Sequence, residues 1–175
     1  TKENYIIAVC GYEGNEAVIT IPTEVEGYNI NYIMGFRLFS DTVETIKIPK
    51  EITYIRDDYD GDPNIGLSRN KSYFKFNKTT NFKEIIVDSE NEKFMSKDGV
   101  LFSKSGYTLY FYPPKKLGTE YMVPSTVGTI ETGALWYLIY LKSLTIPQSV
   151  RYICEYSISE SLEKFIIETQ RAELT

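Results

Sequence analysis

The sequence predicts a repeat solenoid, in which short coils stack along one axis and share a parallel sheet on one side. Three observations predict it. An apolar–proline dipeptide recurs along the chain, alternating apolar residues precede it, and two further apolar residues follow it three positions apart. One such coil cannot bury its own apolar face, whereas stacked coils can, and their stacking gives a continuous core.

The recurring dipeptides are Ile21-Pro22, Ile48-Pro49, Val123-Pro124 and Ile146-Pro147. Two further segments, ending at Val87 and Ile167, keep the alternating half of the pattern without the proline. The anchors at positions 21, 48, 87, 123, 146 and 167 are therefore 27, 39, 36, 23 and 21 residues apart. The last two spacings are the bare repeat, and the longer ones contain insertions.

Alternation such as Ile46-x-Ile48 is typical of a half-buried strand. Proline cannot donate to a sheet ladder, so it ends each strand and turns the chain. The spacing of Val150 and Ile153 after the proline suits an extended or helical turn that returns over the core. Alternation also predicts the residues that face inward: Ile19, Ile21, Ile46, Ile48, Ile85, Val87, Tyr121, Val123, Leu144, Ile146, Phe165 and Ile167.

The same alternation predicts two outward columns on the exposed sheet face. One column is Thr20, Lys47, Ile86, Met122, Thr145 and Ile166, and the other is Val18, Thr45, Glu84, Glu120, Ser143 and Lys164. Ile86, Met122 and Ile166 are apolar at outward positions, and exposed apolar patches often mark interfaces. The alternatives are that a neighbouring segment or domain covers these side chains, or that single apolar residues are tolerated there.

Residues 96–113 are predicted to form a hairpin. Val100–Ser103 and Tyr107–Tyr112 flank Lys104-Ser105-Gly106, and Gly106 suits the positive-φ position of a three-residue loop. The aromatic side of this hairpin is either a docking ledge or a face that packs onto the solenoid.

These residues resemble the BspA-type leucine-rich repeats of bacterial surface proteins. The segment Ile130-Glu131-Thr132-Gly133-Ala134-Leu135-Trp136-Tyr137 is similar to the Ile-Gly-x-x-Ala-Phe step of that family, and further copies start at Ile33 and Ile153. Residues 91–113 are similar to an insertion that recurs in the family. The opening Cys10-Gly11-Tyr12-Glu13-Gly14 resembles its N-terminal cap.

The resemblance implies an α/β repeat fold: a right-handed, β-rich leucine-rich-repeat solenoid of about six coils, with a parallel sheet on one face and a β-hairpin insertion. We expect a single domain over 1–175. It would comprise a cap (1–17), repeats (18–95) with a loop insertion at 56–73, the hairpin (96–113), and repeats with the C-terminal end (114–175). The resemblance further implies a binding role at a bacterial cell surface or outside the cell.

Composition excludes several classes of function. The 19 Lys and Arg against 24 Asp and Glu give a net charge of −5, which argues against nucleic acid and anionic membranes as partners. The absence of His removes His-dependent catalysis and His-liganded metals. No apolar run approaches the ~20 residues of a membrane span, and no signal peptide pattern is visible, so the extracellular location follows from the resemblance alone.

One stretch resembles a metal site. Asp58, Asp60 and Asp62 have the spacing of a calcium loop. However, Pro63 replaces the required Gly and Arg69 replaces the bidentate Glu, so we interpret the stretch as a solvated loop. We expect no cofactor, no resident metal and no catalytic residues. Cys10 and Cys154 lie near opposite ends of the stack and should be free thiols, because a disulfide needs Cα atoms within ~7 Å.

The expected function is therefore protein binding through the outward columns, with a host or cell-surface protein as the partner. Fifteen Tyr residues and an aromatic content of 14% keep a carbohydrate-binding module as an alternative, using tyrosines and Trp136 with carboxylates at the rim. A structural spacer in a larger extracellular protein is the third hypothesis.

Overall fold

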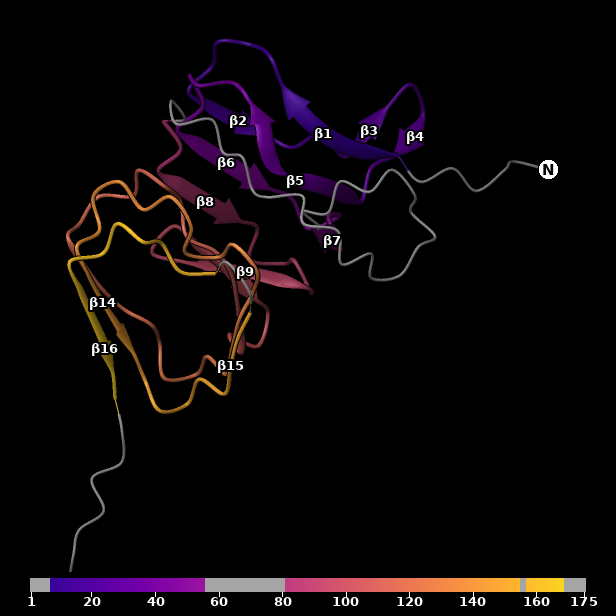
Figure 1. The fold of residues 1–175 in the computed structure, drawn as a ribbon. Helices are drawn as coiled ribbons and strands as arrows, with labels where there is room; N and C mark the ends of the chain where they lie inside the picture. Colours follow the sequence, from indigo (N-terminus) through magenta and orange to yellow (C-terminus); the bar gives the residue numbers. More distant parts are fainter. Residues whose placement is uncertain (1–6, 56–80, 155–156, 169–175) are drawn as a thin grey trace, which may run out of the picture.

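The computed structural model describes residues 7–55, 81–154 and 157–168, which form a β-solenoid of about six turns (Figure 1). These ranges contain strands and turns and no helix, so the α/β label of the expected class has no counterpart in them. The loop insertion expected at 56–73 lies outside the described residues.

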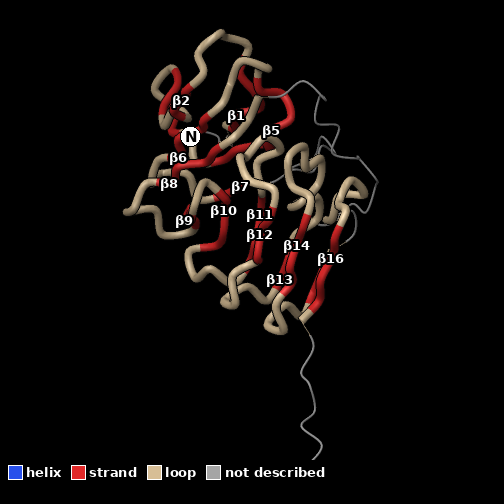
Figure 2. Tube along the Cα trace, turned by 90° about the vertical axis from the view of Figure 1, so that its left-hand side faces the viewer, coloured by secondary structure: helices blue, strands red, loops and turns tan. Residues whose placement is uncertain are grey.

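One side of the solenoid carries the strands that precede the recurrent anchors. Two parallel sheets of three strands make up this side, where the sequence predicted one continuous sheet (Figure 2). The difference arises because β8 and β12 do not pair. The strands of the two sheets are β2 (Val18–Thr20), β6 (Thr45–Ile48) and β8 (Glu84–Val87), then β12 (Glu120–Met122), β14 (Ser143–Ile146) and β16 (Lys164–Ile167).

A second side carries β1 and the strands that follow the first five anchors and return across the stack. Two further sheets form here, and their long-range pairings are parallel except for those of β9 and β10. The first sheet contains β1 (Ala8–Tyr12), β5 (Tyr32–Phe39) and β7 (Tyr54–Ile55). The second contains β15 (Tyr152–Ile153), β13 (Thr129–Ile130), β11 (Thr108–Phe111), β10 (Val100–Ser103) and β9 (Phe94–Lys97) in spatial order. A short hairpin of β3 (Glu24–Val25) and β4 (Tyr28–Asn29) stands apart.

Two reverse turns fold β9, β10 and β11 into an antiparallel meander. Asp98 and Gly99 link β9 to β10 with φ of 52° and 76°. A pair of positive φ values is what a tight turn between right-twisted strands requires, and Asp-Gly is a favoured sequence for it. The turn between β10 and β11 places Gly106 at φ 73°, and the two strands pair antiparallel.

The core consists of two clusters that meet at β10. Val100, Leu101 and Phe102 are all buried, and side chains alternate across a strand. Leu101 therefore packs into the cluster of the first three coils, whereas Val100 and Phe102 pack into the cluster of the last three. Burial of each such side chain contributes roughly 1.5–3 kcal/mol. The strand β10 thus runs through the interior as a partition between the two halves of the stack.

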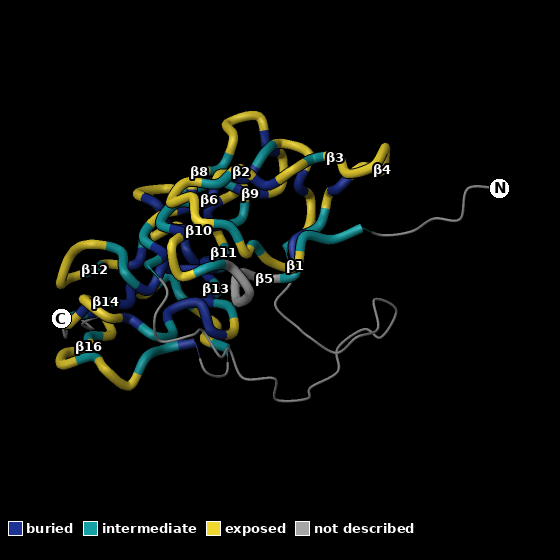
Figure 3. Tube along the Cα trace, turned by 90° about the horizontal axis from the view of Figure 1, so that it is seen from above, coloured by how far each residue is buried: buried dark blue, intermediate teal, exposed yellow. Residues whose placement is uncertain are grey.

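Most residues expected to face inward do so, including Ile21, Ile46 and Leu144. Phe165 and Ile167 lie in register with the buried Leu144 and Ile146 on this inward face, yet they are 44% and 56% exposed. Both lie on β16, which pairs with β14 on one side and has no strand on the other side among the described residues. Figure 3 shows this end of the stack as largely exposed, in contrast to the buried interior.

Candidate binding surface

Strand register brings the outward residues into aligned rows on the first side of the solenoid. Thr20, Lys47 and Ile86 are successive partners across β2, β6 and β8. Across β12, β14 and β16, the partners are Met122, Thr145 and Ile166. The second column is aligned in the same way. Its successive partners are Val18, Thr45 and Glu84 in the first sheet, and Glu120, Ser143 and Lys164 in the second.

The three apolar residues of the first column differ in exposure. Met122 is 64% exposed and Ile86 is 40% exposed, while Ile166 is half-buried. Ile86 is the last residue of this column in the first sheet, and Met122 is its first residue in the second sheet. The break between the two sheets separates them. The apolar strip expected from the sequence is therefore interrupted: Ile86 stands alone on the first sheet, and Thr145 separates Met122 from Ile166 on the second.

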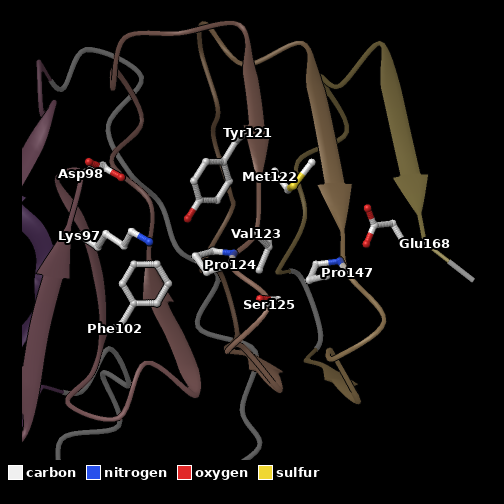
Figure 4. A pocket seen from close by; sticks show the side chains of 10 residues that line it. All are labelled: Lys97, Asp98, Phe102, Tyr121, Met122, Val123, Pro124, Ser125, Pro147 and Glu168. Carbon is white, nitrogen blue, oxygen red and sulfur yellow. The ribbon is translucent and has the colours of Figure 1, made fainter.

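A pocket of about 250 Å³ opens at this gap (Figure 4). The β9–β10 turn contributes Lys97 and Asp98, and the buried ring of Phe102 comes from β10. Tyr121 and Met122 of β12 form part of the opposite wall. The turns that follow β12, β14 and β16 complete the lining. The remaining lining residues are Val123, Pro124, Ser125, Pro147 and Glu168.

Sequence reasoning missed this pocket. It assigned Tyr121 to the interior and gave no role to Lys97, Asp98 or Glu168. These residues are far apart in sequence, and only the fold brings them together. The Asp98-Gly99 pair, a strong signal for a tight turn, was the one feature that could have indicated an extra strand beside β8.

Two tyrosines connect the pocket to the core. The rings of Tyr112 and Tyr121 meet edge to face with centroids 4.8 Å apart. Burial raises the pKa of Tyr112 to about 12. Burial also raises the pKa of Tyr121, and the nearby Tyr112 and Asp98 raise it further. Tyr121 thus lines the pocket, and Tyr112 packs behind it in the core.

The aromatic residues of the hairpin divide between core and surface. Phe111 and Tyr112 are 5% and 2% exposed, so this part of the aromatic side packs onto the solenoid. Tyr107 is 49% exposed beside the β10–β11 turn. The indole of Trp136 lies against the ring of Tyr137, with centroids 5.9 Å apart.

The weak calcium candidate, Asp58, Asp60 and Asp62, lies outside the described residues. Within the described ranges no group of three or more Cys, Asp or Glu side chains could hold a metal ion. Both cysteines are free thiols: Cys10 is exposed with its Sγ 3.6 Å from the Met34 Sδ, and burial raises the pKa of Cys154. No helix in the described ranges is long and apolar enough to cross a membrane.

Three solved structures share this fold. The pneumococcal vaccine antigen PcpA superposes with a TM-score of 0.58 at 22% identity, over 87% of this chain and 39% of PcpA. A leucine-rich repeat protein from Eubacterium ventriosum superposes with a TM-score of 0.51 at 21% identity, over 94% of this chain and 43% of its own length. A leucine-rich cell surface protein from Faecalibacterium prausnitzii superposes with a TM-score of 0.53 at 22% identity, over 85% of this chain and 41% of its own length. No protein-family pattern and no curated protein matches the sequence.

The fold thus defines a leucine-rich-repeat solenoid, in agreement with the resemblance to the BspA-type repeats of bacterial surface proteins. The chain spans about two fifths of the length of the structures that it matches. At these identities the comparisons establish the fold alone.

Proposed function

We propose that this chain is a non-catalytic protein-binding module of a bacterial cell-surface or secreted protein. The observation that carries the proposal is the outward column on the first side, with Met122 64% exposed and Ile86 40% exposed among polar neighbours. Exposed apolar surface often marks sites of protein interaction, and these side chains stand on the two sides of the break between the sheets. The outward surface stands on two parallel sheets, so it loses little conformational entropy on binding.

The fold favours a protein partner over a substrate. Its strands present side chains in rows over an extended surface, and repeat solenoids commonly use such surfaces for recognition. The extracellular location is supported by one structural neighbour that is described as a cell surface protein and another that is a vaccine antigen. Fold alone does not assign function, so the binding surface itself has to be tested.

The test immobilises the chain and measures binding to an array of purified extracellular proteins and to a glycan array. We expect a protein ligand whose affinity falls at least tenfold in the triple variant I86S/M122S/I166S. The matched control is the double variant L117S/Y152S, which removes two side chains that are 75% and 67% exposed elsewhere on the molecule. An unchanged affinity in the folded triple variant would argue against the outward column, and binding confined to glycans would favour the carbohydrate-binding alternative.

A further inference from the structure

The strand β12 has one edge that is paired and one that is not. The Val123 N–H donates to the Thr145 carbonyl at 3.0 Å, and the Ser143 N–H donates to the Thr119 carbonyl at 2.9 Å. The main-chain groups of the odd-numbered residues therefore face β14. Because these groups alternate along a strand, those of Glu120 and Met122 face the opposite side.

The corresponding edge of β8 is covered, in contrast. The Ile85 N–H donates to the Gly99 carbonyl at 3.0 Å, and the Val87 N–H donates to the Ser96 Oγ at 3.0 Å. The β9–β10 turn thus satisfies the β8 edge, and exposed strand edges are normally covered in such ways.

Among the described residues, no strand satisfies the free edge of β12. Its only paired strand in these ranges is β14, and no Cα atom of β8, β9 or β10 lies within 8 Å of a Cα atom of β12. Paired strands lie about 4.8 Å apart. The space between β12 and the strands β8, β9 and β10 is therefore a slot wider than one strand spacing, and the pocket extends from it past the end of β12 to Pro147 and Glu168 (Figure 4).

Uncompensated charges surround this slot. Asp98 and Glu168 line the pocket together with Lys97, and Glu120 stands on the exposed part of β12. None of these four side chains forms an ion pair or a hydrogen bond with another described residue. Beside the slot, Asp98 and Glu120 against Lys97 leave an excess of one negative charge, and Glu168 adds another farther along the pocket, which favours a basic occupant.

The walls of the pocket favour a side chain over a sugar ring. Phe102 is 2% exposed and the ring of Tyr121 packs against Tyr112, so neither presents the open aromatic face on which a sugar stacks. The exposed Met122 and two prolines provide apolar contacts at the rim. A cavity of ~150 Å³ holds benzene, so a pocket of about 250 Å³ has room for a lysine or arginine side chain.

We propose that an extended, basic segment of a protein partner adds to β12 as a further strand and places a lysine or arginine side chain in the pocket. Its main chain would pair with Glu120 and Met122, and its cation would lie near Asp98 and Glu120. Main-chain pairing would supply affinity and the pocket would supply specificity, as in other cases of strand addition. This inference rests on the proposed protein-binding function and specifies the partner's conformation and charge.

The test uses the acetylated and amidated octapeptide (Val-Lys)4 as the probe and records amide spectra of the ¹⁵N-labelled chain. We expect the amide signals of Glu120 and Met122 to shift, and hydrogen exchange at Met122 to slow at least tenfold. The same peptide N-methylated at every residue should not bind, because none of its residues retains a main-chain N–H to donate. The peptide (Val-Glu)4 should bind at least tenfold more weakly.

Variants separate the main-chain contribution from the side-chain contribution. M122P removes the N–H that faces the slot, and M122S keeps that N–H as the matched control. We expect M122P to abolish binding and M122S to weaken it only severalfold. D98N preserves a favoured turn residue beside Gly99, and the double variant D98N/E120Q should lose at least tenfold in affinity. E24Q, on the distant β3, should leave the affinity unchanged.

Equal binding of the N-methylated peptide, or unshifted Glu120 and Met122 amides in a saturated complex, would overturn strand addition. So would saturable shifts of the pocket amides by maltotriose in the absence of any peptide effect. These failures differ from failure of the proposed function. A protein ligand that still depends on Ile86 and Ile166 would preserve that function while strand addition fails. The peptide experiments use the unmodified chain, so they decide the matter even if M122P does not fold.

Discussion

The side chain of Asn91 donates a hydrogen bond to the main-chain carbonyl of Ile52 at 2.9 Å, across 39 residues of sequence. Its Nδ2 also donates to the Pro49 carbonyl at 2.9 Å, and its Oδ1 accepts from the N–H groups of Lys93 and Phe94. Asn91 is completely buried, and these four hydrogen bonds satisfy its amide. One side chain thus joins the turn after β6 to the start of β9.

Replacement of Asn91 by alanine should therefore destabilise the fold by about 3 kcal/mol, because carbonyl and N–H groups of both segments lose their partners. The measurement is urea unfolding followed by circular dichroism. N29A, at an exposed position of β4, is the matched control and should cost little. A cost for N91A no larger than that of N29A would show that water replaces the four hydrogen bonds.

The division of the core by β10 leads to a second prediction. L101A should destabilise the chain by about 3 kcal/mol, as large-to-small changes in a packed core do. L117A, at a position that is 75% exposed, is the control. Since Leu101 packs with Ile85 in the first cluster, a double-mutant cycle of L101A with I85A should show coupling.

The matching cycle of L101A with L144A tests the partition itself, because Leu144 belongs to the second cluster. We expect the two costs to add within about 0.5 kcal/mol. Coupling of Leu101 to Leu144 as strong as its coupling to Ile85 would mean that the two clusters act as one core.

The strands that end at the anchors were predictable from the sequence because their signal is local. Alternation at Ile46 and Ile48 selects the buried face, and the following proline marks the end of the strand. The registers of the outward columns follow from the same alternation. The columns therefore appear on the surface where the sequence places them, although their binding role stays a proposal.

The partition by β10 was not predictable in this way. Val100, Leu101 and Phe102 are successive apolar residues, and such a run does not distinguish a strand buried on both faces from other buried segments. The break between β8 and β12, and with it the pocket, follows from where that strand lies. The exposure of Phe165 depends on a neighbouring coil, which alternation within β16 does not encode.

The two residues of the β9–β10 turn give a third prediction. Gly99 has φ of 76°, and a Cβ atom there would lie 3.1 Å from the Glu84 Cγ. G99A should cost about 1–2 kcal/mol for the left-handed conformation, with a further cost for the contact. G27A is the matched control, because Gly27 has φ of 78° and open space around its Cα.

Unfolding in urea should show that G99A costs more than G27A, and amide exchange should become faster at Ile85, whose N–H is bonded to the Gly99 carbonyl. Equal costs for the two variants would show that the Glu84 side chain moves aside freely and that the turn keeps its position.

Buried tyrosines predict a loss of stability in alkali. Burial raises the pKa of Tyr112 to about 12, compared with about 10 for an unburied tyrosine. Between these two values the unfolded chain releases the proton and the folded chain retains it, so the unfolded state is favoured as the pH rises. The stabilising contribution is complete below pH 10 and is lost by about pH 12. Tyr121, whose pKa burial also raises, should act in the same direction.

The urea midpoint should therefore fall between pH 9 and pH 11.5. It should fall less in Y112F/Y121F, which retains both rings but has neither phenolic hydroxyl. An identical decline in the wild type and the double variant would assign the alkaline loss to other groups.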